Sequence, residues 1–252
     1  MTPATDLAAL RAARDDVLGQ IADACARSGR SPADVALIAV SKTVSSERVR
    51  TAVEAGFKRF GENRVQEGEG KAAAVSSASW DLIGPLQSNK AKRAIQVFDT
   101  IQTVDSVSLA ERLDRLVAET GARARYPVLL QVNVDRDQAK AGFLPEVLTG
   151  AAESLGSLDH LDIRGLMTVG RLVARPEDAR PTFVALRELS QQLRDAWPGL
   201  GRELSMGMTD DFPVAVEEGA TIVRVGRAIF GERPHHDGAA EAHDHQAVTD
   251  RA

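Results

Sequence analysis

The sequence has little cysteine, no excess of positive charge and no long apolar run, and each shortage excludes a class of protein. Its single cysteine, Cys25, excludes an internal disulfide and a cysteine-based metal cluster. No apolar stretch approaches the roughly 20 residues needed to span a bilayer, and residues 1–6 lack the basic-then-apolar order of a secretory signal. We therefore expect a soluble cytoplasmic protein without a membrane partner.

Charge is balanced and slightly negative. The chain carries 31 lysine and arginine residues against 36 aspartate and glutamate residues, a formal net charge of −5 at pH 7, with the two signs interspersed. Broad binding to nucleic acid needs a concentrated basic surface, so we expect no nucleic-acid partner. The hydrophobic content of 43% is ample for a core in a chain of 252 residues.

Short β-rich runs recur along the chain, and most are continuously apolar, as in a parallel sheet covered on both faces. They span 35–41, 57–61, 80–84, 100–104, 127–134, 161–167, 203–206 and 222–226. Eight such strands close a (β/α)8 TIM barrel of roughly 250 residues, and the alternative is an open doubly wound sheet. No linker or composition shift divides the chain, which favours one barrel domain over residues 1–234.

Helical patterns separate these runs, with caps and glycines at their ends. They cover 47–55, with Ser45 and Ser46 as cap candidates, and a segment that Asp105 or Ser106 could cap and that runs through Thr120 to Gly121. Pro176 opens another helix, and Asp210 and Asp211 are predicted caps of 213–219. An extra helix precedes the first strand, and its apolar face consists of Leu7, Leu10, Val17, Leu18, Ile21 and Cys25. Cys25 is therefore interpreted as a core residue, not a nucleophile. The polar, histidine-containing stretch 235–252 is predicted to be a disordered tail.

Lys42 directly follows the first apolar run. A strand that delivers a lysine to its buried carboxyl end places the amine in a medium that disfavours the ammonium form. Such a lysine can act as a nucleophile near neutral pH and can form an imine. A solvated lysine at a strand end is the alternative, so the interpretation depends on what accompanies Lys42.

Two glycine-containing segments, 204–211 and 224–231, follow the last two strands, where barrels often bind phosphate. Gly207 and Gly226 allow close approach of the backbone, and Ser205 offers a hydroxyl. Ordinary βα turns use the same residues and are the alternative. An amine suited to an imine and a phosphate site together suggest pyridoxal phosphate.

Other strand ends also carry polar side chains, most of which serve turns and caps. Asn63 and Asn89 are the exceptions that we follow, because neutral amides suit a cofactor pocket. Asp210 and Asp211 are interpreted as helix caps, so no metal ligands are predicted.

Six segments resemble those of the pyridoxal phosphate homeostasis proteins, also called the YggS/PROSC or PLPBP family. They are residues 39–43, 60–63, 83–90, 164–167, 204–208 and 224–231, in the last of which position 227 is not part of the match. The resemblance runs from about residue 37 to residue 231. Arg64 stands where the family often has an aromatic residue, and Thr209 stands where serine is usual.

The resemblance implies a single-domain barrel like the N-terminal domain of alanine racemase, with pyridoxal phosphate held as an aldimine on Lys42. It implies a set of cofactor-binding residues, namely Lys42, Asn63, Met167, Ser205, Met206, Gly207, Arg224, Gly226 and Arg227. Among them, Ser205, Gly207, Gly226 and Arg227 match the phosphate-binding segments, and Arg224 matches the arginine that faces the pyridine nitrogen. The family is associated with intracellular vitamin B6 balance. We expect a monomer that passes the cofactor to pyridoxal-phosphate-dependent apoenzymes.

The residues also bear on whether the chain is an enzyme. A permanently charged arginine at the pyridine nitrogen keeps that nitrogen unprotonated, so the ring withdraws electrons weakly. A racemase with such a ring needs a second acid or base, but Tyr126 and His160 precede strands and lie at the other end of the barrel. We therefore predict a carrier or buffer with no catalytic residue and no amino-acid turnover. A racemase-like enzyme is the alternative.

Overall fold

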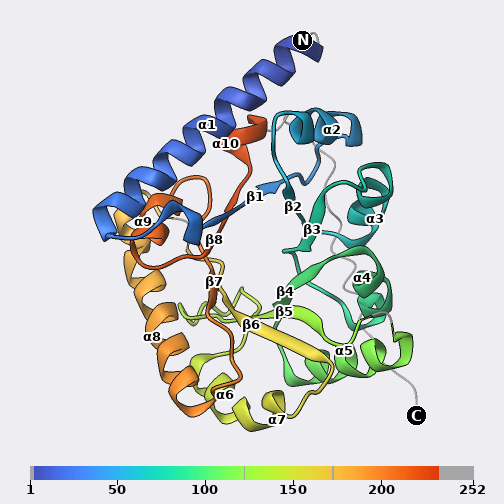
Figure 1. The fold of residues 1–252 in the computed structure, drawn as a ribbon. Helices are drawn as coiled ribbons and strands as arrows, with labels where there is room; N and C mark the ends of the chain where they lie inside the picture. The colour runs from blue at the N-terminus through green and yellow to red at the C-terminus, as the bar shows by residue number, and fades with distance from the viewer. Residues whose placement is uncertain (1–2, 122, 172, 233–252) are drawn as a thin grey trace, which may run out of the picture.

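A closed barrel organises the chain, whose residues 3–121, 123–171 and 173–232 are described by a computed structural model. Parallel strands follow one another around the barrel in the order of the sequence (Figure 1). They are β1 (Ala36–Val40), β2 (Arg59–Glu62), β3 (Ser79–Leu82), β4 (Thr100–Val104), β5 (Tyr126–Gln131), β6 (Leu161–Met167), β7 (Glu203–Ser205) and β8 (Ile222–Val225). β1 pairs with β8, where Ile38 lies opposite Arg224 and Ala39 opposite Val225. The predicted (β/α)8 barrel is confirmed, and the open sheet is excluded.

Helices surround the barrel in the layer outside the strands (Figure 1). They are α1 (Pro3–Ser28), α2 (Ser46–Glu54), α3 (Val65–Ala74), α4 (Ala91–Val97), α5 (Val107–Thr120), α6 (Pro145–Gly150), α7 (Ala152–Gly156), α8 (Arg180–Ala196), α9 (Phe212–Glu217) and α10 (Arg227–Phe230). Short 3-10 turns occur at η1 (Pro32–Asp34), η2 (Ser88–Lys90) and η3 (Pro176–Ala179).

Several helix ends follow the predicted capping chemistry. The Ser45 and Ser106 hydroxyls accept hydrogen bonds from the first-turn amides of α2 and α5, each at 3.3 Å. Gly121 ends α5 with a φ of 59°, which favours glycine. Pro176 opens η3 as expected, and the α-helix proper starts at Arg180.

The predicted capping role is wrong for Asp210 and holds only in position for Asp211. Asp211 occupies the N-cap position of α9, but its side chain makes no capping hydrogen bond. Its carboxylate instead accepts a hydrogen bond from the Met208 amide at 2.6 Å, because the preceding loop turns back on itself. Asp210 pairs with Arg227. Both carboxylates therefore brace the loop after β7.

No helix within the described ranges is long and apolar enough to cross a membrane. The tail predicted at 235–252 lies outside the described residues.

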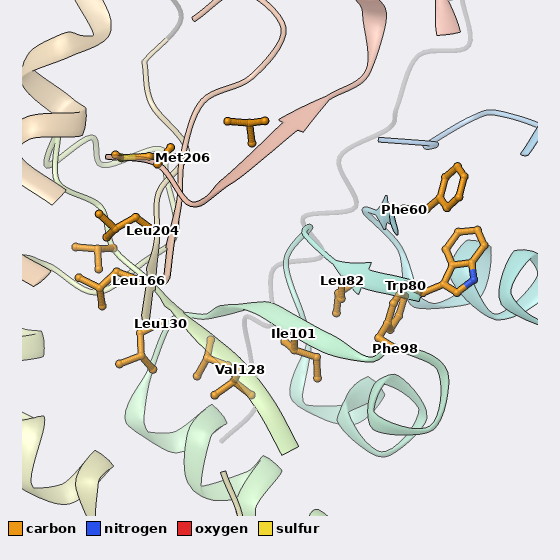
Figure 2. Packing of buried hydrophobic residues seen from close by; sticks show 14 of the residues in the cluster. Phe60, Trp80, Leu82, Phe98, Ile101, Val128, Leu130, Leu166, Leu204 and Met206 are labelled. Atoms are coloured by element: carbon orange, nitrogen blue, oxygen red, sulfur yellow. The ribbon is translucent and has the colours of Figure 1, made fainter. Parts of the chain in front are cut away.

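Among the described residues, two apolar clusters make up the core. The larger fills the layer between sheet and helices, and in Figure 2 it includes Phe60, Trp80 and Phe98, with the Phe60 and Trp80 rings stacked at 5.4 Å. The smaller lies inside the barrel and consists of Ile38, Leu129, Met167 and Ile222. Each fully buried side chain of this kind contributes about 1.5–3 kcal/mol. The continuously apolar strand runs thus face two separate hydrophobic clusters, one on each side of the sheet.

The N-terminal helix α1 packs along the outside of the barrel beside α9 and α10 (Figure 1). Leu10, Val17, Ile21 and Cys25 are fully buried against it, and Cys25 is a core residue as predicted. Leu18 is 36% exposed, so its assignment to the buried face is wrong. Leu18 follows Val17 by one position, about 100° around the helix, and turns away from the core.

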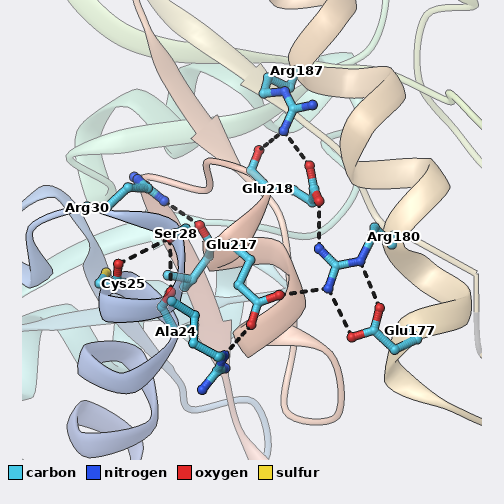
Figure 3. A network of polar contacts seen from close by, with 11 residues as sticks. Ala24, Cys25, Ser28, Arg30, Glu177, Arg180, Arg187, Glu217 and Glu218 are labelled. Atoms are coloured by element: carbon cyan, nitrogen blue, oxygen red, sulfur yellow. Dashed lines mark hydrogen bonds and ion pairs between the residues drawn. The ribbon is translucent and has the colours of Figure 1, made fainter.

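Ion pairs join α1 to α8 and α9. The Arg27 guanidinium lies 2.6 Å from Glu217, which also pairs with Arg180 at 2.7 Å. Arg180 contacts Glu218 as well, at 2.6 Å. We define the α1 ion-pair network as Arg27, Glu177, Arg180, Arg187, Glu217 and Glu218. Figure 3 labels all of these residues except Arg27.

Candidate functional site

Lys42 lies in a turn that leaves the carboxyl end of β1. Ser41 before it is fully buried, Lys42 is half-buried, and Thr43 after it is exposed. The Val44 amide donates to the Ser41 carbonyl at 2.9 Å and closes the turn. Thr43 has a φ of 67°, a left-handed conformation that is costly for a β-branched residue. The predicted imine lysine therefore sits in a tight, strained turn.

A buried cluster surrounds the backbone of this turn. The Lys71 ammonium, on α3, donates to the Ser41 carbonyl at 2.6 Å, to Glu62 Oε1 at 2.7 Å and to Glu67 Oε1 at 2.6 Å. The Ser41 hydroxyl also donates to Glu62, at 2.6 Å, and the Thr43 amide donates to Glu67 at 2.7 Å. We call Ser41, Glu62, Glu67 and Lys71 the Lys71 cluster.

The pKa values of the two carboxylates in the Lys71 cluster are shifted in opposite directions. Burial raises the pKa of Glu62 above its ordinary value, and hydrogen bonds from Lys71 and Ser41 offset this only in part. Partial burial also opposes ionisation of Glu67, but hydrogen bonds from Lys71 and from the Thr43 amide outweigh it and lower the pKa of Glu67. Glu67 is therefore the more firmly ionised partner of the lysine.

A second polar network runs through the inside of the barrel. The Arg59 guanidinium donates twice to Asp81, at 2.7 Å each, and the Gln102 amide nitrogen donates to the same carboxylate at 2.6 Å. The Ser205 hydroxyl donates to the Gln102 carbonyl oxygen at 2.6 Å and accepts from Arg224 at 2.6 Å. We call Arg59, Asp81, Gln102, Ser205 and Arg224 the interior chain.

The order of donors and acceptors in the interior chain is fixed from its anionic end. The Asp81 carboxylate only accepts, so Gln102 must turn its amide nitrogen toward it. The carbonyl oxygen of Gln102 then faces Ser205, which must donate to it and offer a lone pair to Arg224. Gln102 and Ser205 thus connect the Asp81 carboxylate to the Arg224 guanidinium through hydrogen bonds of fixed direction.

Arg224 is only 4% exposed, and its second donor bonds to the Thr168 carbonyl at 2.7 Å. Burial lowers the pKa of Arg224 to about 10, against the opposing effect of the nearby Asp211 carboxylate. The guanidinium therefore remains charged at neutral pH. Burial raises the pKa of Asp211, whose bond from the Met208 amide favours the ionised form.

Of the two glycines predicted to bind phosphate, the fold itself requires glycine only at position 207. Gly207 has a φ of 91°, and a Cβ there would lie 2.6 Å from the Ala215 Cβ, so the fold itself requires glycine. A Cβ at Gly226 would meet nothing closer than Val40, at 3.4 Å, and its φ is −118°. Because packing does not require glycine at position 226, its bare backbone fits close approach by a ligand.

Thr209 is a residue that the predicted site did not include. Its hydroxyl accepts a hydrogen bond from the Gly226 amide at 3.3 Å, which brings the loop after β7 against the end of β8. Arg227 is exposed and pairs with Asp210 and with Glu232. The departure at Thr209 from the serine usual in the resembling family was the sequence signal that could have identified it.

The remaining predicted site residues lie on different sides of the sheet. Met167 packs inside the barrel, and Met206 belongs to the layer between sheet and helices (Figure 2). Asn63 is half-buried after β2, and its backbone abuts Gly84, where a Cβ would lie 2.2 Å from the Asn63 carbonyl oxygen. Asn89 is exposed in η2. Asn63 thus lies at the same barrel end as Lys42.

The groups excluded as a second acid or base lie where the sequence predicted. Tyr126 is the first residue of β5, and its hydroxyl donates to the Phe98 carbonyl at 2.6 Å. Burial raises its pKa far above the ordinary value. His160 precedes β6 and contacts Asp114 at 3.3 Å. Because the strands are parallel, both lie at the barrel end opposite Lys42.

The donors gathered at the carboxyl ends of β1, β7 and β8 fit an aldehyde-bearing phosphate ester. Lys42 supplies an amine, Arg224 and Arg227 supply cations, and Thr209 supplies a hydroxyl beside the bare Gly226 backbone. The described part of the chain brings together no group of histidine, cysteine or acidic side chains able to hold a metal ion.

Sequence comparisons point to one family. Residues 21–234 match the family model of the alanine racemase N-terminal domain. The chain is 41% identical over 221 residues to a pyridoxal phosphate homeostasis protein of Pseudomonas aeruginosa, a match that covers 87% of this chain and 94% of that protein. A protein of the same name from Aquifex aeolicus is 39% identical over 221 residues, covering 87% and 96% respectively.

Solved structures agree with this. PipY of Synechococcus elongatus, solved with PLP bound, is 43% identical, with a TM-score of 0.75 over 84% of this chain and 100% of that chain. Alanine racemase of Clostridium difficile is 17% identical, with a TM-score of 0.64 over 81% of this chain and 53% of that chain. The second likeness shows the fold alone.

Proposed function

This chain belongs to the pyridoxal phosphate homeostasis protein family, and from that premise we propose that it binds pyridoxal phosphate covalently on Lys42 and serves cofactor balance as a carrier or buffer. The supporting observation is the pairing of β1 with β8. It brings the turn that bears Lys42 next to Gly226. A Cβ built at Gly226 would lie 3.4 Å from Val40, two residues before Lys42. An amine and a bare backbone for phosphate thus meet on adjacent strands.

Most of the predicted residues receive a role in this proposal. Lys42 would attach the cofactor through its amine, and Arg224 would interact with its pyridine nitrogen. The Gly207 backbone, Arg227 and the Thr209 hydroxyl would bind the phosphate, and the bare backbone of Gly226, whose amide donates to Thr209, leaves room for it. Asn63, Met167 and Met206 stay predictions as pocket residues.

Ser205 takes a different part from the one that the sequence predicts. A phosphate oxygen needs a donor, and the proton of Ser205 already serves Gln102. We therefore assign Ser205 to holding Arg224 in place and Thr209 to the phosphate.

The cofactor supplies an aldehyde that exchanges reversibly between amines, and this is all that a carrier needs. The chain's own residues favour storage over turnover. The charged Arg224 disfavours protonation of the facing nitrogen, and Tyr126 and His160 lie at the other barrel end. A positioned acid or base usually contributes about 10²–10⁴-fold to proton transfer. Racemisation lacks that contribution here.

The decisive experiment traps the attachment. Borohydride reduction of pyridoxal-phosphate-loaded protein, followed by peptide mass spectrometry, should place the adduct on Lys42, and Lys42→Ala should abolish it. Lys90→Ala is the control and should leave it unchanged. An adduct on Lys90 or Lys140 instead would refute the assignment.

A second experiment separates carrier from enzyme. Loaded protein incubated with L-alanine in deuterated water should show no enzyme-like formation of D-alanine, yet should transfer cofactor to a pyridoxal-phosphate-dependent apoenzyme. Steady D-alanine formation that Lys42→Ala removes would favour the racemase instead. The cytoplasmic location and the monomeric state stay predictions, the latter testable by sedimentation.

A further inference from the structure

The Lys71 cluster is a costly structure to place beside a turn. Lys71 is 5% exposed and Glu62 is fully buried. Taking an ammonium and a carboxylate out of water costs several kcal/mol per ion, and well-packed apolar residues of similar volume are often as stable. Glu62 Oε2 has no hydrogen-bond partner among the residues described, so the cluster is not optimised for stability alone.

The three donors of Lys71 converge on one end of the barrel. An ammonium has three N–H groups, and here one reaches the backbone after β1, one reaches Glu62 at the end of β2, and one reaches Glu67 on its own helix. A single side chain thus fixes the position of α3 relative to the first two strand ends.

Lys42 lies between the two backbone groups that the cluster holds. The Ser41 carbonyl before it accepts from Lys71, and the Thr43 amide after it donates to Glu67. A left-handed conformation at a non-glycine residue such as Thr43 costs of order 1–3 kcal/mol and persists only where its surroundings impose it. The bond from Thr43 to Glu67 is such a constraint.

We propose that Lys71, acting with Glu62 and Glu67, is a positioning residue that holds the Ser41–Thr43 turn so that the Lys42 amine is presented for covalent attachment of the cofactor. The inference rests on the proposed function of Lys42 and extends it to residues on β2 and α3. Lys71 itself does not touch the cofactor.

The test compares two ligands that differ at one carbon. Pyridoxal 5′-phosphate has the aldehyde that attaches to an amine, whereas pyridoxine 5′-phosphate has an alcohol there and binds only noncovalently. Lys71→Met should weaken binding of the aldehyde and lower the borohydride-trapped fraction roughly 10- to 100-fold, the range typical of a misplaced reacting group. Binding of pyridoxine 5′-phosphate should change less than about twofold, since the phosphate site is intact.

Two conservative variants keep the test decisive if Lys71→Met does not fold. Lys71→Arg retains the charge and should recover part of the trapped fraction. Glu67→Gln retains an acceptor for the Thr43 amide and should lose less of the trapped fraction than Glu67→Leu, which retains none. Thermal unfolding of each variant reports folding separately.

The outcomes distinguish this inference from the function beneath it. Equal loss of both ligands in Lys71→Met, or no loss of either, would make Lys71 merely structural and overturn the inference. Failure of Lys42→Ala to abolish trapping would overturn the proposed function itself, whatever Lys71 does.

Discussion

The interior chain and the α1 ion-pair network both pair arginine with a carboxylate, but in opposite settings. In the interior chain, Asp81 and Ser205 are fully buried and Arg224 nearly so. In the α1 ion-pair network, the side chain of Arg27 is 56% exposed and that of Arg180 is 31% exposed. Water can replace any lost partner at the surface but not inside the barrel. The number of ion pairs is thus a poor guide to which network matters.

The largest loss of unfolding free energy is expected when Asp81 of the interior chain is replaced. Asp81→Ala leaves the Arg59 and Gln102 donors without their shared acceptor inside the barrel. Removing one partner of a buried charged pair costs about 3–5 kcal/mol. Because the Arg59 side chain is 24% exposed, urea unfolding should measure a loss at the lower end of this range. A loss below about 1 kcal/mol, the level of an exposed pair, would break the comparison.

Replacing Ser205 tests the interior chain at a point nearer the candidate site. Ser205→Ala removes a donor from Gln102 and an acceptor from Arg224, which should destabilise the fold by about 1–3 kcal/mol. If Ser205 acts through Arg224, cofactor affinity should fall equally for pyridoxal and for its phosphate ester. Isothermal titration with both ligands measures this, and a loss confined to the ester would return Ser205 to the phosphate site.

Thr209 is half-buried, so its environment is intermediate between the buried interior chain and the more exposed α1 ion-pair network. Thr209→Val keeps the shape of the side chain and removes the hydroxyl. Its affinity for pyridoxal phosphate should fall by about 1–1.5 kcal/mol, close to tenfold, and its affinity for pyridoxal should stay unchanged. Thr209→Ser, which retains the hydroxyl, is the matched control and should bind both ligands as the parent protein does.

The smallest effect is expected at Glu217. Hydrogen bonding to Arg180 outweighs partial burial and lowers the pKa of Glu217 below its ordinary value of 4.5. A depressed carboxyl pKa gives stability that is present above the unfolded-state value and is lost as pH falls through the folded-state value. Glu217→Gln should therefore cost about 0–1 kcal/mol at pH 7, and less in high salt. As pH falls through the depressed folded-state pKa, the difference from the parent should disappear in urea unfolding.

Much of the architecture could be predicted because it depends on local patterns. Continuous apolar runs marked the strands, and their number predicted the barrel. Lys42 and Gly226 could be placed directly after strands because strand ends can be located without knowing which strands pair.

What could not be predicted depends on barrel closure. Nothing near Ser205 in the sequence indicates that its hydroxyl bonds to Gln102, which lies 103 residues earlier in the chain. Lys71 was missed for a similar reason, since it lies in a helix with two glycines and its partners come from two strands. A pattern reports which face a residue prefers, but a hydrogen-bond partner is set by three-dimensional neighbours.

The pairing of β1 with β8 also bears on biosynthesis. Lys42 leaves the ribosome early, whereas Gly226 and Arg224 are among the last residues of the barrel to be made. These residues thus come together only when the final strand docks and the ring of strands closes. Under the proposed function, a nascent or truncated chain lacking β8 has the lysine without the phosphate site. Cofactor binding would then stabilise completed chains over incomplete ones by mass action.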